Sequence, residues 1–150
     1  MLETEIVFRP LAVPLSKKAL RAFRRDAGWP AGDSKALSHN EDPRGKVQWV
    51  TVGRGKETIG IARLELAPPQ FCYLSDLIIS KAYRGKGVGN WFMKKIEQYC
   101  SQCGIPRVLL KPLEDTRGFY EKMNFVVDPN ADMFLKKEIN PFLPKMLGKH

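Results

Sequence analysis

Six residues, Arg84-Gly85-Lys86-Gly87-Val88-Gly89, have the spacing most typical of a chemical site in this sequence. Glycine at every second position lets the backbone turn tightly and approach a ligand without interference from a Cβ atom. Successive amide N–H groups at the start of a helix bind anions, helped by the helix dipole. Arg84 and Lys86 add positive charge at the same place. The segment therefore predicts a phosphate or pyrophosphate site.

Two well-known phosphate motifs do not fit. The dinucleotide fingerprint needs a third glycine where this sequence has Asn90, and the Gly-Lys-Ser/Thr of the Walker A loop is absent. The remaining alternative is a glycine-rich turn without a ligand. We favour the ligand site, because three glycines at a helix start destabilise the helix. A role in ligand binding gives a reason for this cost, whereas a turn without a ligand does not.

The elements that must position this turn follow from hydrophobic periodicity. We expect strands at residues 6–8, 47–52, 58–66, 73–79, 108–110, 125–127 and 133–137. We expect helices from an N-cap at Ser16 to about Ala27, from the glycine turn to about Cys103, and from Thr116 to Lys122. The second helix would bury one stripe, formed by Val88, Phe92, Ile96, Tyr99 and Cys103. The order favours an α/β (α+β three-layer) class, with helices on both faces of a mixed, mostly antiparallel sheet of six or seven strands.

Length and composition bound the remaining possibilities. The 150 residues suffice for one domain, with a core over about 5–137 and an extended tail over 138–150. The formal net charge of +9 attracts anions but does not choose among them. Three cysteines are too few for a disulfide framework, and no apolar run is long enough to cross a membrane, so we expect a cytoplasmic protein.

Two motifs in order resemble the GNAT superfamily of N-acetyltransferases. Arg84, Gly87 and Gly89 match the fixed positions of the acetyl-CoA signature Gln/Arg-x-x-Gly-x-Gly/Ala. Residues 118–125, Gly-Phe-Tyr-Glu-Lys-Met-Asn-Phe, are similar to the family's Phe-Tyr-Glu-Lys-x-Gly-Phe segment. The element order over about residues 5–137 agrees with the same family.

The resemblance implies an acetyl-CoA-dependent N-acetyltransferase that uses direct attack by an amine, without a covalent enzyme intermediate. Leu77 N–H would polarise the thioester carbonyl, and Tyr120 would give a proton to the departing CoA thiolate. The main chain of Ile79 would pair with the pantetheine arm. The expected cofactor-binding residues are Leu77, Ile78, Ile79, Arg84, Gly85, Lys86, Gly87, Val88, Gly89 and Asn90.

The general base and the acceptor are less determined. Asp76 is the only carboxylate of its strand; regular alternation points it away from the site, and a β-bulge would redirect it. Solvent relayed through Ser75 is the alternative base. We expect Trp29, Tyr73 and Ser75 to contact the acceptor, which the family selects with the segments corresponding here to residues 28–46 and 140–150.

Two departures from the family pattern stand out. Leu113 replaces the asparagine that commonly begins the second motif, which puts one cofactor hydrogen bond in doubt. Asn124 replaces a glycine, which asparagine can do because it tolerates left-handed backbone geometry. Cys100 and Cys103 have metal-like spacing, but we assign them to core packing rather than zinc and expect no metal. His39 and His150 have no identifiable triad partner.

Other functions remain open. Leu113 and the missing base would also fit a CoA-binding regulator without catalysis. The positive charge would fit an acetyltransferase acting on a nucleic-acid-linked or protein amine, although no nucleic-acid motif is present and this reading ranks last. The acceptor is a small-molecule or peptide amine in the leading hypothesis, and a homodimer is left open.

Overall fold

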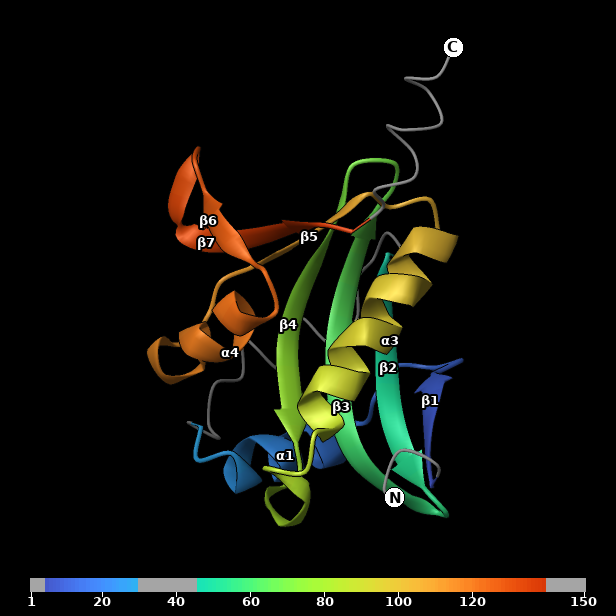
Figure 1. Ribbon diagram of the computed structural model, residues 1–150. Coiled ribbons are helices and arrows are strands. Elements are labelled where there is room, and N and C mark those ends of the chain that lie inside the picture. Colours follow the sequence, from blue (N-terminus) through green and yellow to red (C-terminus); the bar gives the residue numbers. More distant parts are fainter. Residues whose placement is uncertain (1–4, 30–45, 140–150) are drawn as a thin grey trace.

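The computed structural model describes residues 5–29 and 46–139, which contain one mixed sheet (Figure 1). Seven strands lie in the order β1-β2-β3-β4-β5-β7-β6. Among the strand pairs of the described residues, only β4–β5 is parallel. This confirms the predicted mixed, mostly antiparallel sheet.

The strands are β1 (Ile6–Pro10), β2 (Val47–Arg54), β3 (Glu57–Ala67), β4 (Phe71–Ile79), β5 (Arg107–Leu110), β6 (Val126–Asp128) and β7 (Ala131–Glu138). The helices are α1 (Lys17–Asp26), α3 (Val88–Gln102) and α4 (Arg117–Lys122), with short 3-10 turns η2 (Lys81–Tyr83) and η3 (Glu114–Thr116). Ser16 caps α1 as predicted, because its hydroxyl accepts a hydrogen bond from the amide of Ala19 at 3.1 Å. No helix in the described ranges is long and apolar enough to cross a membrane.

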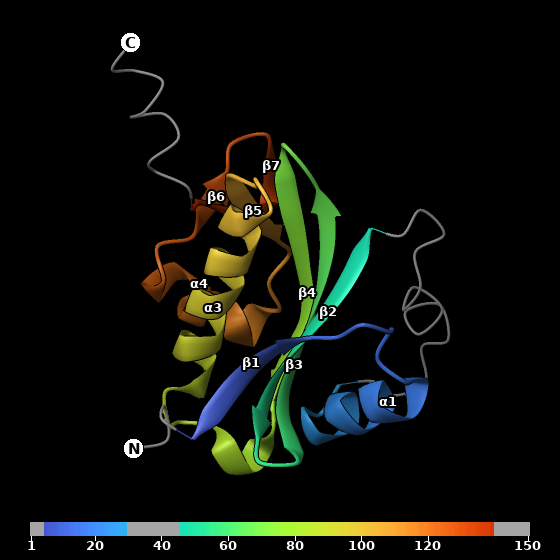
Figure 2. The same cartoon turned by 90° about the vertical axis from the view of Figure 1, so that its right-hand side faces the viewer.

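The helices cover both faces of the sheet. Seen from the side, α1 lies on one face, and α3 and α4 lie on the other (Figure 2). A large apolar cluster packs under α3, and Phe92 and Ile96 are fully buried within it. A smaller cluster under α1 contains Leu20 and Trp49.

One sequence expectation about α3 was wrong. Its buried positions are Val88, Phe92, Met93, Ile96 and Cys100. Cys103 is exposed instead of closing the stripe, because the helix ends at Gln102 and the chain turns at Gly104. Tyr99 packs only partly buried against the cluster.

Strands β4 and β5 pair over only part of their length. Their register joins Cys72 to Val108, Tyr73 to Leu109 and Leu74 to Leu110, and no pair follows. β4 continues to Ile79 without a partner on that side. In Figure 1, β5 and β7 lean away from β4, and α4 lies beside the separated part. The splay leaves one edge of β4 open from Ser75 onward.

A β-bulge interrupts β4 where the splay begins. Between the pairs Ile61–Ile78 and Arg63–Ser75, β3 advances two residues while β4 advances three. Asp76 lies within this stretch and has a left-handed backbone, with φ of 52°. The bulge reverses the alternation of the strand. Leu74 packs under α3 before it, whereas Ile78, four residues on, packs under α1.

Candidate active site

The glycine-rich turn at residues 84–89, called the phosphate turn below after its predicted ligand, leads from η2 into α3. Gly85 and Gly87 have φ of 74° and 84°, left-handed conformations that favour glycine, and Gly87 is the N-cap of α3. The first helical hydrogen bond runs from Trp91 N–H to Gly87 O at 3.1 Å. Within the described ranges, none of the amides of residues 85–90 donates a hydrogen bond to the protein. These donors are therefore available to an anion.

Gly89 lies against the ring of Phe119. A Cβ atom at this position would lie 3.3 Å from Cε1 and 3.4 Å from Cζ of Phe119. Phe119 belongs to α4, so the absent side chain lets the two helices approach closely.

Arg84 does not direct its side chain to the turn. Its Nε donates to Ile79 O at 2.9 Å, and Nη2 lies 3.5 Å from Oδ2 of Asp26. Its amide N–H lies 3.3 Å from Lys81 O. The expectation that the amides from Arg84 onward bind an anion therefore needs correction at its first residue, because that donor already has an acceptor in the protein.

A cavity of about 900 Å³ extends from this turn to α4. Its wall includes Leu77 and Ile79 from the open edge of β4, together with Tyr120. The side chains of Ile78 and Val88 are buried in the two apolar clusters, so these residues could reach a cofactor only through their main chains. Charged residues on the wall are Arg84, Lys94, Glu97, Asp115, Lys122 and Lys137. Glu97 and Lys137 pair with each other at 3.0 Å.

Tyr120 lies on α4 with its ring held by two aromatic neighbours. The ring centroids of Phe119 and Phe125 are 5.1 and 5.6 Å away in edge-to-face arrangements. Tyr120 is 7% exposed, and burial raises the pKa of its phenol above the ordinary value near 10. The phenol is therefore protonated at neutral pH and can donate a proton.

A second, smaller cavity of about 50 Å³ shares part of its wall, including Tyr120, with the first. Three residues line both cavities: Leu77, Thr116 and Tyr120. The second cavity is further lined by Trp29, Leu74, Ser75, Asp76, Leu110, Lys111, Pro112 and Leu113. The two cavities therefore lie on either side of, or next to, the residues that they share.

The residues predicted for the acceptor fall into two groups. Trp29 and Ser75 line the second cavity. Trp29 also packs against the cluster under α1. Tyr73 lines neither cavity; its ring packs against Phe134 at 6.1 Å, and burial raises the pKa of its phenol.

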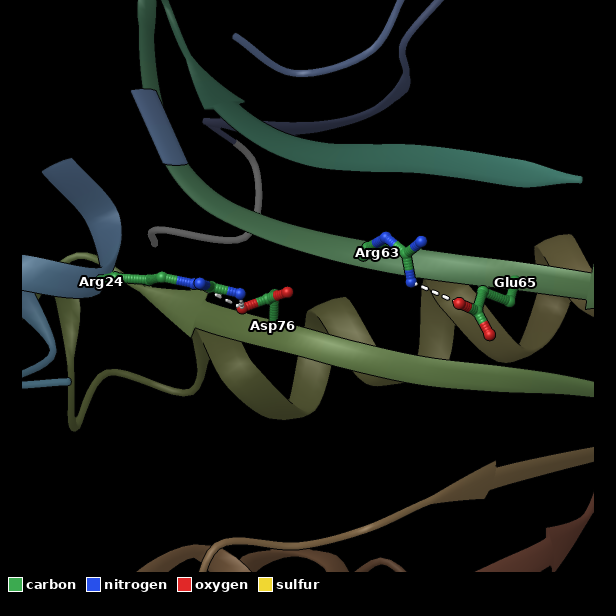
Figure 3. A network of polar contacts seen from close by, with 4 residues as sticks. All are labelled: Arg24, Arg63, Glu65 and Asp76. Atoms are coloured by element: carbon green, nitrogen blue, oxygen red, sulfur yellow. Dashed lines mark hydrogen bonds and ion pairs between the residues drawn. The ribbon is translucent and has the colours of Figure 1, made fainter. Parts of the chain in front are cut away.

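The carboxylate of Asp76 is bound by Arg24 of α1 (Figure 3). The Nε and Nη2 atoms of Arg24 donate to one oxygen, Oδ1, at 2.9 and 2.7 Å. The two side chains are 10% and 9% exposed. The bulge does redirect Asp76, as the sequence allowed, but it directs the carboxylate to the α1 face and an arginine.

Asn124 and Leu113 are the two positions that differ from the family pattern in the second motif. Asn124 has φ of 73°, the left-handed backbone expected of it. Leu113 is 46% exposed, lines the second cavity and precedes η3. Residues 30–45 and 140–150, and with them His39 and His150, lie outside the described residues.

Sequence reasoning missed Arg24, Asp26 and Thr116. Arg24 is charged, yet it is only 8% exposed. Its position four residues after the buried Leu20 was the available signal, because residues four apart share a helix face. Asp26 accepts a hydrogen bond from the amide of Lys81 at 2.7 Å, and no sequence pattern indicates that contact.

A family model described as the acetyltransferase (GNAT) family matches residues 15–125. Three solved structures are similar over nearly the whole chain. The PaiA N-acetyltransferase of Thermoplasma acidophilum, in complex with coenzyme A, is 18% identical with a TM-score of 0.65, covering 89% of this chain and 98% of its own. GCN5 of Tetrahymena is 15% identical with a TM-score of 0.72, covering 90% and 97%. An aminoglycoside 6'-N-acetyltransferase complexed with coenzyme A is 14% identical with a TM-score of 0.66, covering 90% and 98%.

Proposed function

Because the chain belongs to the acetyltransferase (GNAT) family and is therefore an acyltransferase, we propose that it transfers the acetyl group of acetyl-CoA to a primary amine. The observation that carries this proposal is that two neighbouring cavities share the wall residues Leu77, Thr116 and Tyr120. The larger cavity would hold acetyl-CoA, and the smaller one would admit the amine.

The residues present fit the co-substrate. Acetyl-CoA supplies an acyl group activated as a thioester and carries a pyrophosphate. The amides of residues 85–90 would bind the pyrophosphate, since they have no acceptor within the described ranges. Two of the similar structures contain coenzyme A, which supports this choice.

Tyr120 would act as the general acid. The amine nitrogen forms a bond to the acyl carbon while the carbon–sulfur bond breaks. The phenol of Tyr120 gives its proton to the departing sulfur and regains one from solvent. The position of Tyr120 supports this role, because Tyr120 lines both cavities and its phenol is protonated at neutral pH.

Leu77 N–H would polarise the thioester carbonyl, since Leu77 lies on the open edge of β4 and lines both cavities. The amine must lose a proton to react. We assign that proton to solvent relayed through Ser75, because Asp76 is engaged by Arg24.

The acceptor is proposed as a small-molecule or peptide amine. Trp29 and Ser75 would contact it, because both line the smaller cavity. Cys72, Cys100 and Cys103 are free thiols, which supports a reducing, cytoplasmic location.

Calorimetric titration with acetyl-CoA tests the proposal, with Gly87→Glu as the paired variant. We expect wild-type binding and its loss in the variant, which adds a carboxylate to a left-handed residue in the turn. Absence of wild-type binding at millimolar acetyl-CoA would defeat the proposal. An acetyl-CoA consumption screen over amino acids, polyamines, aminoglycosides and peptides then identifies the acceptor class. Binding without turnover across that panel would favour a CoA-binding regulator.

A further inference from the structure

The end of α1 contacts three parts of the candidate site. Arg24 binds Asp76 at the bulge of β4. Asp26 accepts a hydrogen bond from the amide of Lys81, at the start of the segment that leads to the phosphate turn. Trp29, in the wall of the smaller cavity, donates its amide N–H to Arg24 O at 2.9 Å. One short stretch of chain thus joins the acceptor side, the bulge and the turn.

The bulge decides where Leu77 lies. In a regular strand, Asp76 would share the α3 face with Cys72 and Leu74. Instead, the left-handed backbone of Asp76 directs its side chain to Arg24 on the α1 face. Leu77 and Ile79 then pack toward the cluster under α3 and line the larger cavity. The position of the Leu77 main chain therefore depends on the conformation of Asp76.

The hydrogen bonds and burial of Arg24 allow it to fix the conformation of Asp76. Two of its donors converge on one carboxylate oxygen, and both side chains are almost fully buried. Charge-assisted hydrogen bonds of this kind are short and directional, and they weaken little with salt when buried.

We propose that Arg24 is a positioning residue for acetyl transfer: by holding Asp76 in its left-handed conformation, it keeps the amide of Leu77 aimed at the thioester carbonyl. This inference rests on the proposed function. Asp76 is then the anchor of the bulge and not the general base.

The variant Asp76→Asn distinguishes two roles of this residue: fixing the bulge through Arg24, and accepting a proton as general base. Asparagine tolerates a left-handed backbone and offers an amide oxygen to Arg24, but it cannot take a proton from an amine. We expect kcat to stay within about tenfold of wild type, whereas removal of a general base costs about 10²- to 10⁴-fold. A loss in that larger range at every pH tested would overturn the proposal.

The infrared stretch of the thioester carbonyl in bound acetyl-CoA reports the aim of the Leu77 amide without any acceptor. A hydrogen bond lowers this frequency relative to free acetyl-CoA. We expect the lowering in wild type and its loss in Arg24→Met. With the best amine of the acceptor panel, we expect kcat of Arg24→Met to fall about 100-fold. KM for acetyl-CoA should change less than about threefold, because the phosphate turn is untouched.

Arg107→Met is the matched control. Arg107 likewise joins two elements through a carboxylate: it links β5 to Glu138 of β7 at 3.0 Å, and it lines neither cavity. We expect its carbonyl frequency and kcat to match wild type. Equal losses in Arg107→Met and Arg24→Met would overturn the proposal.

A double variant controls for loss of activity through misfolding. Arg24→Met leaves a buried carboxylate without its arginine, so Arg24→Met/Asp76→Asn removes both charges and keeps a residue suited to φ of 52°. We expect the double variant to lose the carbonyl shift as well. An unchanged shift and kcat in the double variant would overturn the proposal. Failure of the proposed function itself is recognised separately, because wild-type protein would then not bind acetyl-CoA.

Discussion

Gly89 of α3 and Phe119 of α4 approach so closely that a Cβ atom at position 89 would lie 3.3 Å from the aromatic ring. Phe119 is in turn an edge-to-face neighbour of Tyr120. The helix that begins at the phosphate turn is thereby packed against the helix that carries the proposed acid. This contact links the two sequence motifs in space.

Gly87 and Gly89 should respond differently to alanine. Nothing lies within 4 Å of a Cβ at Gly87, but its φ of 84° disfavours any L side chain. We expect Gly87→Ala to lower the free energy of unfolding by about 1 kcal/mol. We also expect weaker acetyl-CoA binding, because the turn must relax. Urea unfolding and calorimetry measure the two effects.

Gly89→Ala tests the helix contact instead. Alanine favours the helix by about 1 kcal/mol over glycine, which offsets part of the crowding against Phe119. We expect kcat to fall more than acetyl-CoA affinity, because the Phe119 ring must shift and it packs against Tyr120. Identical binding and kinetic defects in the two alanine variants would contradict this division of roles.

Tyr120→Phe keeps the ring contacts and removes only the phenol oxygen. We expect kcat to fall about 100-fold or more, the range of a general acid, with KM for acetyl-CoA little changed. Steady-state kinetics over a pH series measures it. Tyr99→Phe is the control, because Tyr99 is on α3 and lines neither cavity of the site. Full activity in Tyr120→Phe would remove this residue from the mechanism.

Burial of Tyr120 also predicts a loss of stability in alkali. Its pKa is raised in the folded state, so above about pH 10 the unfolded chain releases the phenolic proton while the folded chain retains it. The contribution of the Tyr120 phenol to the free energy of unfolding is fully present below about pH 10. It is lost as the pH rises, by at most about 1.4 kcal/mol per pH unit. Urea unfolding of wild type and Tyr120→Phe at several alkaline pH values should show the smaller decline in the variant. Parallel curves would argue that the phenol is not buried.

The Arg24–Asp76 pair makes a separate prediction about stability. Because the side chains are 10% and 9% exposed, Arg24→Met should lower the free energy of unfolding by about 3–5 kcal/mol, leaving a buried charge. Arg24→Met/Asp76→Asn should recover part of that loss. The exposed Arg107–Glu138 pair should contribute no more than about 1 kcal/mol by the same urea measurement. A double variant no more stable than Arg24→Met would contradict the claim that Arg24→Met leaves a buried, unpaired carboxylate at Asp76.

Local signals predicted most elements because each depends on residues close in sequence. The Ser16 cap and the left-handed Asn124 are contacts or conformations of one turn. The burial of α3 was predicted less well: Cys100 replaced Cys103 on the buried stripe. The end of that helix depends on how the chain continues into β5, which periodicity alone does not report.

The sequence by itself determined the glycine turn, the order of strands and helices, and the placement of an aromatic acid candidate on a short helix. These features depend on backbone freedom and hydrophobic spacing, which are local. Only the tertiary structure decided that Tyr120 lines two neighbouring cavities and that Asp76 is bound by Arg24, 52 residues away. A pairing of that kind depends on which sheet face a bulge presents to which helix, and sequence spacing carries no record of it.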